Sequence, residues 1–155
     1  MSTPRIGLTQ FIDASPEAVW TVISDLGSAA ETLTGVDAIE LLTDGPYDVG
    51  TRWRETRTMF GMKDTMEMEV AESTPHRSTV ILSPVGDLLY RTEFTLRPRV
   101  AGGTELHMAF SAEQPPQSGL KALATSMLAG IGLRATRTSM EQDLQDIAAA
   151  ARTRG

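Results

Sequence analysis

The chain has 155 residues, of which 41% are hydrophobic and 22% charged, and its formal net charge is −6. We expect one soluble domain over residues 1–155, because this length and composition suffice for a substantial core. The absence of cysteine excludes disulfides, thiolate metal sites and a cysteine nucleophile. An acidic chain with no basic run repels phosphate backbones, so we expect no nucleic-acid partner.

No stretch approaches the roughly 20 apolar residues of a spanning helix, so we expect no membrane insertion and a cytoplasmic location. The two histidines, His76 and His107, fall on an expected turn and an expected strand, without the paired spacing of metal ligands. Gly130 and Gly132 lie within a helical stretch and lack the third glycine of a phosphate-binding loop. We therefore expect neither a metal nor another cofactor.

The N-terminal part of the chain predicts a strand followed by two short helices. Apolar and polar residues alternate roughly over 5–12, as in a half-buried strand. Ser15 suits a helix N-cap and Pro16 the first helical position, and Gly27 is expected to end that helix. A second short helix is expected over 28–33.

From residue 36 onward the hydrophobic pattern changes to alternation, which favours strands. Turns containing glycine or proline separate the segments. Six strands are expected, over 36–42, 50–59, 63–72, 78–83, 88–97 and 104–112. Strands joined in succession by hairpins form an antiparallel sheet.

The last stretch, 118–152, predicts a long helix with one apolar face. Its apolar residues recur at steps of three and four, so this face must be buried, and the preceding sheet is the natural partner. The glycines at 130 and 132 predict a kink or a change of phase near the middle. The stripe consists of Leu120, Leu123, Met127, Ile131, Met140, Leu144, Ile147 and Ala151.

Four short motifs are spread over nearly the whole chain: Ala14-Ser-Pro-Glu-Ala-Val-Trp20, Gly50-Thr-Arg-Trp53, Glu72…Pro75-x-Arg77 and Gly103-Thr104-Glu-Leu. With the order of the elements, they resemble the START-like (SRPBCC) superfamily of polyketide cyclases, plant pollen-allergen-type proteins and lipid-transfer domains. The resemblance implies an α+β helix-grip fold, in which a seven-stranded antiparallel sheet wraps around the C-terminal helix and encloses a hydrophobic cavity. This fold hosts binding proteins, cyclases, aromatases and regulators, so the site must decide the function.

Strand parity indicates which side chains face that interior. On the 50–59 strand, Trp53, Glu55 and Arg57 share one face, and Trp53 is expected to be buried. An inward Glu55 would then need an arginine or a polar group of a ligand as its partner, because an isolated buried charge is costly. The alternative is that Glu55 and Arg57 lie solvated at the open end of the sheet.

The other expected ligand-binding residues are apolar or aromatic, and methionine is frequent among them. Methionine adapts to irregular shapes and is common on permissive hydrophobic surfaces. The same pattern also occurs in ordinary packed cores, which leaves a filled interior as an alternative. The expected set is Trp53, Glu55, Arg57, Met66, Met68, Tyr90, Phe94, Met108, Phe110, Met127 and Ile131.

Two functions from different classes follow from this interior, and the first is favoured. The chain would bind a small hydrophobic molecule, lipid- or polyketide-like, without catalysis. Alternatively it would be a polyketide cyclase or aromatase, in which Glu55, Arg57 or Tyr90 steers enol chemistry by hydrogen bonding and proton transfer. A third hypothesis makes the apolar hairpin tip at 59–62 a contact for a partner protein. The sequence identifies neither the ligand nor the oligomeric state.

Overall fold

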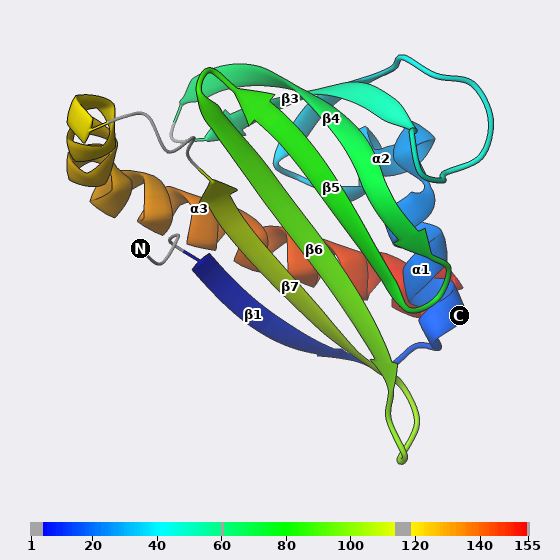
Figure 1. Cartoon of the computed structure of the whole chain (residues 1–155). Helices are drawn as coiled ribbons and strands as arrows, with labels where there is room; N and C mark the ends of the chain where they lie inside the picture. Colours follow the sequence, from blue (N-terminus) through cyan, green and yellow to red (C-terminus); the bar gives the residue numbers. More distant parts are fainter. Residues whose placement is uncertain (1–4, 60, 114–118, 155) are drawn as a thin grey trace.

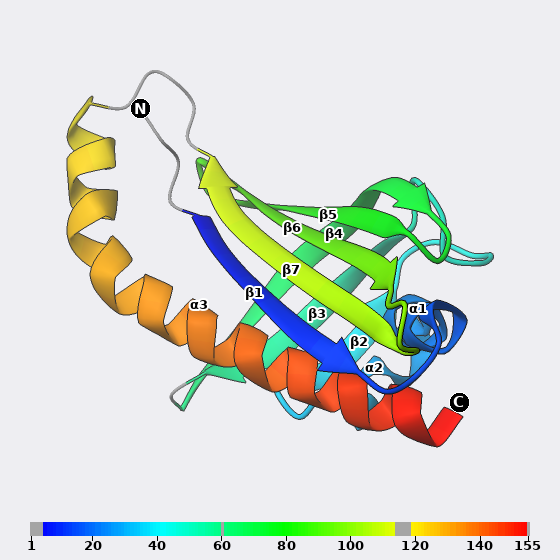
Figure 2. The same ribbon diagram turned by 90° about the horizontal axis from the view of Figure 1, so that it is seen from below.

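A computed structural model describes residues 5–59, 61–113 and 119–154, with the backbone alone for 119–133. Seven strands form one antiparallel sheet in the order β1-β7-β6-β5-β4-β3-β2. The sheet is curved, and α3 runs along its concave side, with α1 and α2 near the C-terminal end of α3 (Figures 1 and 2). The expected α+β helix-grip fold is therefore confirmed.

The elements follow the predicted order. The strands are β1 Arg5–Ile12, β2 Val36–Leu41, β3 Arg52–Met59, β4 Met62–Thr74, β5 Ser78–Val85, β6 Leu88–Pro98 and β7 Thr104–Glu113. The helices are α1 Pro16–Ser24, α2 Ala29–Thr32 and α3 Gly119–Arg154, with a short 3-10 helix, η1, at Leu26–Ser28.

Two boundaries differ from the predictions for local reasons. Helix α1 ends at Ser24 and not at Gly27, because the chain tightens into η1 directly after Asp25. Pro84 was expected in a turn but extends β5, where it pairs with Leu89 of β6. The turn itself is only Gly86-Asp87, and Gly86 takes the positive φ of 60° that such a tight turn needs.

The start of α1 forms as its sequence predicts. The Ser15 side chain accepts a hydrogen bond from the Ala18 amide at 3.1 Å, and Pro16 occupies the first helical position. The helix buries Val19, Trp20 and Val22. Capping thus fixes where the helix begins, and its buried face fixes how it packs on the rest of the core.

The hydrophobic core lies between α1, the C-terminal part of α3 and strands β1, β6 and β7. Its α3 residues are the second half of the predicted stripe, because Met140, Leu144, Ile147 and Ala151 are all buried. The first half of that stripe, Leu120, Leu123, Met127 and Ile131, lies outside the residues whose side chains the structure describes. Helix α3 is unbroken at its two central glycines and curves along its length in Figure 2.

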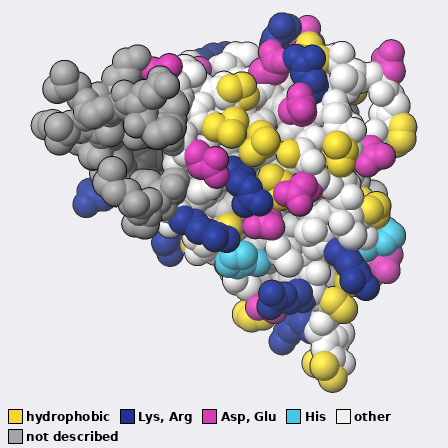
Figure 3. All heavy atoms as spheres, viewed as in Figure 1, with side chains coloured by type: hydrophobic (Ala, Val, Ile, Leu, Met, Phe, Trp, Pro, Cys, Tyr) yellow, Lys and Arg dark blue, Asp and Glu magenta, His cyan; other side chains and the backbone are white. Residues whose placement is uncertain are grey.

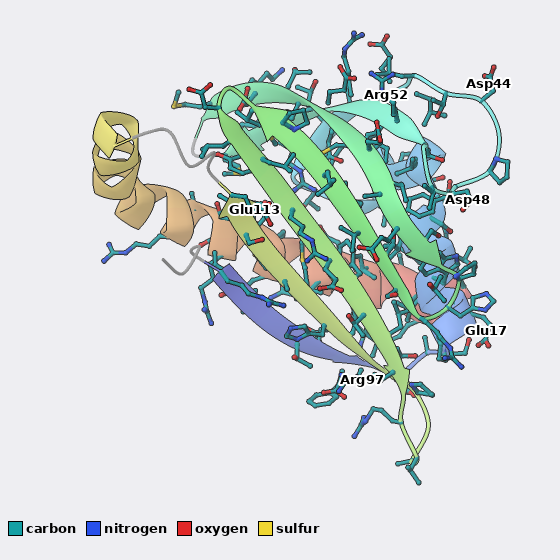
Figure 4. All side chains as sticks on the ribbon, viewed as in Figure 1. Glu17, Asp44, Asp48, Arg52, Arg97 and Glu113 are labelled. Carbon is teal, nitrogen blue, oxygen red and sulfur yellow. The ribbon has the colours of Figure 1, made fainter. Side chains whose placement is uncertain are left out.

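The convex face of the sheet is exposed and mixes charged with hydrophobic side chains (Figure 3). Figure 4 labels Arg52 near the start of β3, where it forms an exposed ion pair with Glu67. The same view labels Arg97 and Glu113, which mark opposite ends of the β6–β7 pair. No helix in the described part of the chain is both long and apolar enough to cross a membrane.

Candidate ligand-binding site

The register of the sheet places the expected side chains together on its concave face. Directly paired residues of antiparallel strands point to the same side, so one inward residue fixes the side of its partner. Burial of Trp53 at 2% exposure identifies the inward face of β3. The pairs on that side include Trp53 with Met68, Glu55 with Met66, Thr92 with Phe110, and Phe94 with Met108.

The burial of these residues varies along the concave face. Phe94 and Met108 belong to the packed core. Met66, Met68, Tyr90 and Phe110 are only half-buried. The Tyr90 and Phe110 rings contact each other with their centroids 5.3 Å apart.

The described core thus leaves a set of inward apolar and aromatic side chains incompletely covered. Met127 and Ile131, the two helix residues expected to face them, lie in the part of α3 with backbone alone.

A buried ion cluster of Glu55, Arg57 and Asp143 joins β3 to α3. The Arg57 guanidinium donates from Nε to Glu55 Oε2, from Nη1 to Asp143 Oδ1 at 3.1 Å and from Nη2 to Asp143 Oδ2 at 2.9 Å. The side chains of the three residues are 9%, 14% and 8% exposed, respectively. The hypothesis that Glu55 and Arg57 lie solvated is therefore wrong.

Two neutral side chains also form hydrogen bonds with the cluster. The Trp53 indole Nε1 donates to Glu55 Oε1 at 3.2 Å, which gives the second carboxylate oxygen a partner. Arg57 Nη1 also donates to Ser139 Oγ at 3.2 Å. Strand β3 thus supplies the indole, one carboxylate and the guanidinium, while α3 supplies the other carboxylate and the hydroxyl.

When both carboxylates are ionised, the cluster carries more negative than positive charge, since one guanidinium faces two carboxylates. Burial raises the pKa of Asp143, and attraction and hydrogen bonds from Arg57 lower it only in part. Burial alone would lower the pKa of Arg57, but attraction to Asp143 and Glu55 and hydrogen bonds to both hold it above its ordinary value. Arg57 is therefore permanently charged. Asp143 takes up a proton at a higher pH than an aspartate in water does.

The segment between α2 and β2 packs against the Arg57 guanidinium. A Cβ at Gly35 would lie 3.3 Å from Arg57 Nη1, so the missing side chain lets the backbone approach the charged group closely. The neighbouring Thr34 donates to Asp146 Oδ2 of α3 from its amide at 2.9 Å and from its hydroxyl at 3.0 Å. This segment is thereby tied to the same helix as Asp143.

Sequence reasoning identified Glu55 and Arg57 but missed Asp143, Ser139 and Gly35. A signal for Asp143 was present, because it follows Met140 by three positions and precedes Ile147 by four. Those spacings place its carboxylate on the buried face of the helix, where it requires a cationic partner. Arg57 was the inward arginine already predicted from the parity of β3.

A second buried polar group lies near α1, outside the predicted set. The Tyr47 hydroxyl lies 2.8 Å from Thr79 Oγ1, and Thr79 donates to the Glu72 carbonyl, so Tyr47 is the donor in the first bond. Burial raises the pKa of Tyr47 to about 12. The ring packs edge-on against Trp20, and the whole arrangement fastens the β2–β3 loop to the core.

Metal binding has no support in the described part of the chain, where no three His, Asp or Glu side chains converge. His107 is half-buried, and its Nδ1 lies 2.9 Å from Thr9 Oγ1. His76 is exposed and contacts the Trp20 ring edge-on. Neither residue belongs to the concave-face site.

The model of the family described as "Polyketide cyclase / dehydrase and lipid transport" matches residues 3–152. The chain belongs to this family. The START-like resemblance inferred from the four sequence motifs is thereby confirmed. A search of curated proteins gave no match.

Solved structures share the fold at low sequence identity. The protein TTHA0849 from Thermus thermophilus is 19% identical with a TM-score of 0.79, over 98% of this chain and 99% of that one. The ZhuI aromatase/cyclase from Streptomyces sp. R1128 is 18% identical with a TM-score of 0.77, over 99% and 96%. The di-domain aromatase/cyclase BexL of the BE-7585A biosynthetic pathway is 18% identical with a TM-score of 0.78, over 96% of this chain and 50% of BexL. At these identities the likeness establishes the fold alone.

Proposed function

We propose that this family member binds a small hydrophobic molecule, lipid- or polyketide-like, between the concave face of the sheet and α3. The observation that carries the proposal is the combination of half-buried apolar side chains with one buried polar cluster on the same face. Ligand sites are typically apolar with a few fixed polar groups that orient the ligand. Here Met66, Met68, Tyr90 and Phe110 supply the apolar surface, and the Glu55–Arg57–Asp143 cluster supplies the polar anchor.

The register of β3 and β4 supports the proposal, because the side chains of the cluster and the two methionines are neighbours on adjacent strands. Glu55 pairs directly with Met66, and Trp53 pairs with Met68. A ligand lying on the two methionines would therefore reach the carboxylate of Glu55 with its polar end. Methionine suits this role because its flexible thioether adapts to ligands of different shape.

Binding of the neutral fluorophore N-phenyl-1-naphthylamine tests the proposal. We expect saturable one-to-one binding by the wild-type protein and its loss in Met66→Arg, because a cation placed on the concave face opposes an apolar ligand. The matched control is Thr65→Arg, which adds the same charge on the exposed outer face of the same strand. Equal binding by both variants, or no binding by the wild type, would contradict the proposal.

A second candidate function is cyclisation or aromatisation of a poly-β-keto chain. It is favoured by the family match and by the placement of Glu55, Arg57 and Tyr90 on the concave side. Buried carboxylates accept protons from acidic methylene groups, and a guanidinium or phenol stabilises the enolate that forms. A poly-β-keto thioester incubated with the protein would then lose water faster than in buffer, and Arg57→Met would remove the acceleration. Equal rates with and without protein would contradict the cyclase function, and ligand binding would remain as the proposed function.

A further inference from the structure

We infer that the ligand presents a hydrogen-bond donor, such as a hydroxyl, phenol or ammonium group, to the Glu55–Arg57–Asp143 cluster, and that free carboxylates are disfavoured. The inference rests on the proposed function and specifies the polar end of the ligand. It follows from which donors and acceptors of the cluster are already used.

The donors of Arg57 are nearly all used. Its guanidinium carries five N–H groups, and four of them donate to Glu55, Ser139 and the two oxygens of Asp143. Among the residues that the structure describes, one N–H of Arg57 and the hydroxyl hydrogen of Ser139 are left over as donors. Arg57 is therefore already engaged by protein carboxylates in the way that it would engage a ligand carboxylate.

The acceptors of the cluster are only partly used. Within the described part of the chain, each of the four carboxylate oxygens of Glu55 and Asp143 accepts one hydrogen bond, from Trp53 or from Arg57. A carboxylate oxygen has two lone pairs, so each of these oxygens retains capacity for one further donor. The unused hydrogen-bonding capacity of the cluster thus favours groups that donate.

The charge of the cluster also favours a hydrogen-bond donor over a carboxylate. When both carboxylates are ionised, they and the one guanidinium leave an excess of one negative charge at side chains that are at most 14% exposed. A ligand carboxylate would add a second uncompensated anion in a poorly solvated place, which is unfavourable. A hydroxyl or ammonium would instead form a charge-assisted hydrogen bond to a carboxylate oxygen.

The test uses three probes that share one alkyl chain: dodecanol, dodecylamine and dodecanoate. The dissociation constant of each probe is measured at neutral pH by displacement of N-phenyl-1-naphthylamine. The two ionic probes are kept below their critical micelle concentrations, and dodecanol is kept below its solubility limit. Intrinsic differences between the head groups cancel when the ratio of the dodecanoate to the dodecylamine constant is compared between variants.

Glu55→Gln and Asp143→Asn each remove one negative charge from the cluster. We expect the wild-type protein to bind dodecylamine and dodecanol more tightly than dodecanoate, and each variant to lower the dodecanoate-to-dodecylamine ratio about tenfold. The control is Glu69→Gln, which removes the same charge from an exposed side chain on β4. It should leave the ratio within about twofold of the wild-type value, because exposed charges are screened.

The outcomes separate this inference from the proposed function. Tighter binding of dodecanoate than of the other two probes, or equal ratios in Glu55→Gln, Asp143→Asn and Glu69→Gln, would overturn the inference while ligand binding stands. Absence of binding by the fluorophore and by all three probes would overturn the proposed function and the inference together. A ratio that falls in either cluster variant and not in Glu69→Gln supports both.

Discussion

At the scale of single residues, Arg57 joins the other charged side chains of the candidate site. It is the only cation within the described ion cluster and faces two carboxylates there. Removing one of the carboxylates would leave a balanced pair, whereas removing Arg57 would leave two buried anions without compensation. Loss of one partner from a buried ion pair is strongly destabilising for that reason.

Arg57→Met should therefore lower the free energy of unfolding by about 3–5 kcal/mol. The matched control is Arg54→Met on the same strand, whose side chain is 48% exposed and pairs with Glu40 on the outer face. That substitution should cost less than about 1 kcal/mol, because exposed ion pairs contribute little. Urea unfolding of both variants measures the two values. A similar loss of unfolding free energy in both variants would mean that the buried cluster contributes no more to stability than the exposed ion pair does.

At the scale of the elements, the sequence predicted the sheet well because its period is set by strand geometry. Alternation of two residues along β3 placed Trp53, Glu55 and Arg57 inward, and the structure has them there. The extent of α1 was less predictable, since the tight 3-10 turn after Asp25 replaces the expected last helical turn. Asp143 was missed because only the apolar members of the α3 stripe were considered, although its spacing from Met140 and Ile147 places it on the same face. Its partner Arg57 lies 86 positions earlier, so the pairing follows only when that spacing is combined with the parity of β3.

The turn between β6 and β7 contains two adjacent glycines, and replacing each of them tests how closely this turn packs against β1. Gly102 and Gly103 both have positive φ, 98° and 85°, so an alanine at either position pays the cost of a left-handed backbone, about 1–2 kcal/mol. A Cβ at Gly102 meets open space, but at Gly103 it would lie 2.6 Å from the backbone oxygen of Ile12 at the end of β1.

Gly103→Ala should therefore destabilise the protein by about 1–3 kcal/mol more than Gly102→Ala, because the backbone of β1 must move. Thermal and urea unfolding of the two variants give the comparison. Equal losses of stability in the two variants would show that the end of β1 moves away from the added Cβ at little cost in free energy. That movement would strain the buried hydrogen bond from Thr104 to the Ala14 carbonyl, which measures 2.7 Å, and it is therefore expected to be costly.

At the scale of the whole molecule, the site depends on a sheet and a helix that are far apart in the sequence. Strand β3 and helix α3 meet through Arg57 and Asp143, and Asp146 ties the segment after α2 to the same helix. The concave surface exists only when these elements are assembled, so a ligand that lies on it binds the folded chain and not the unfolded one. Such a ligand must raise the stability of the whole fold by mass action.

N-phenyl-1-naphthylamine at about 100 times its dissociation constant should therefore raise the wild-type free energy of unfolding by about 2.7 kcal/mol. The quantity measured is the difference between urea unfolding with and without the probe. This difference is independent of any loss of stability that a substitution itself causes. Met66→Arg should show almost no increment and Thr65→Arg the full one. An increment of equal size in both variants would place the probe on the outer surface, and the concave face would then not be the binding site.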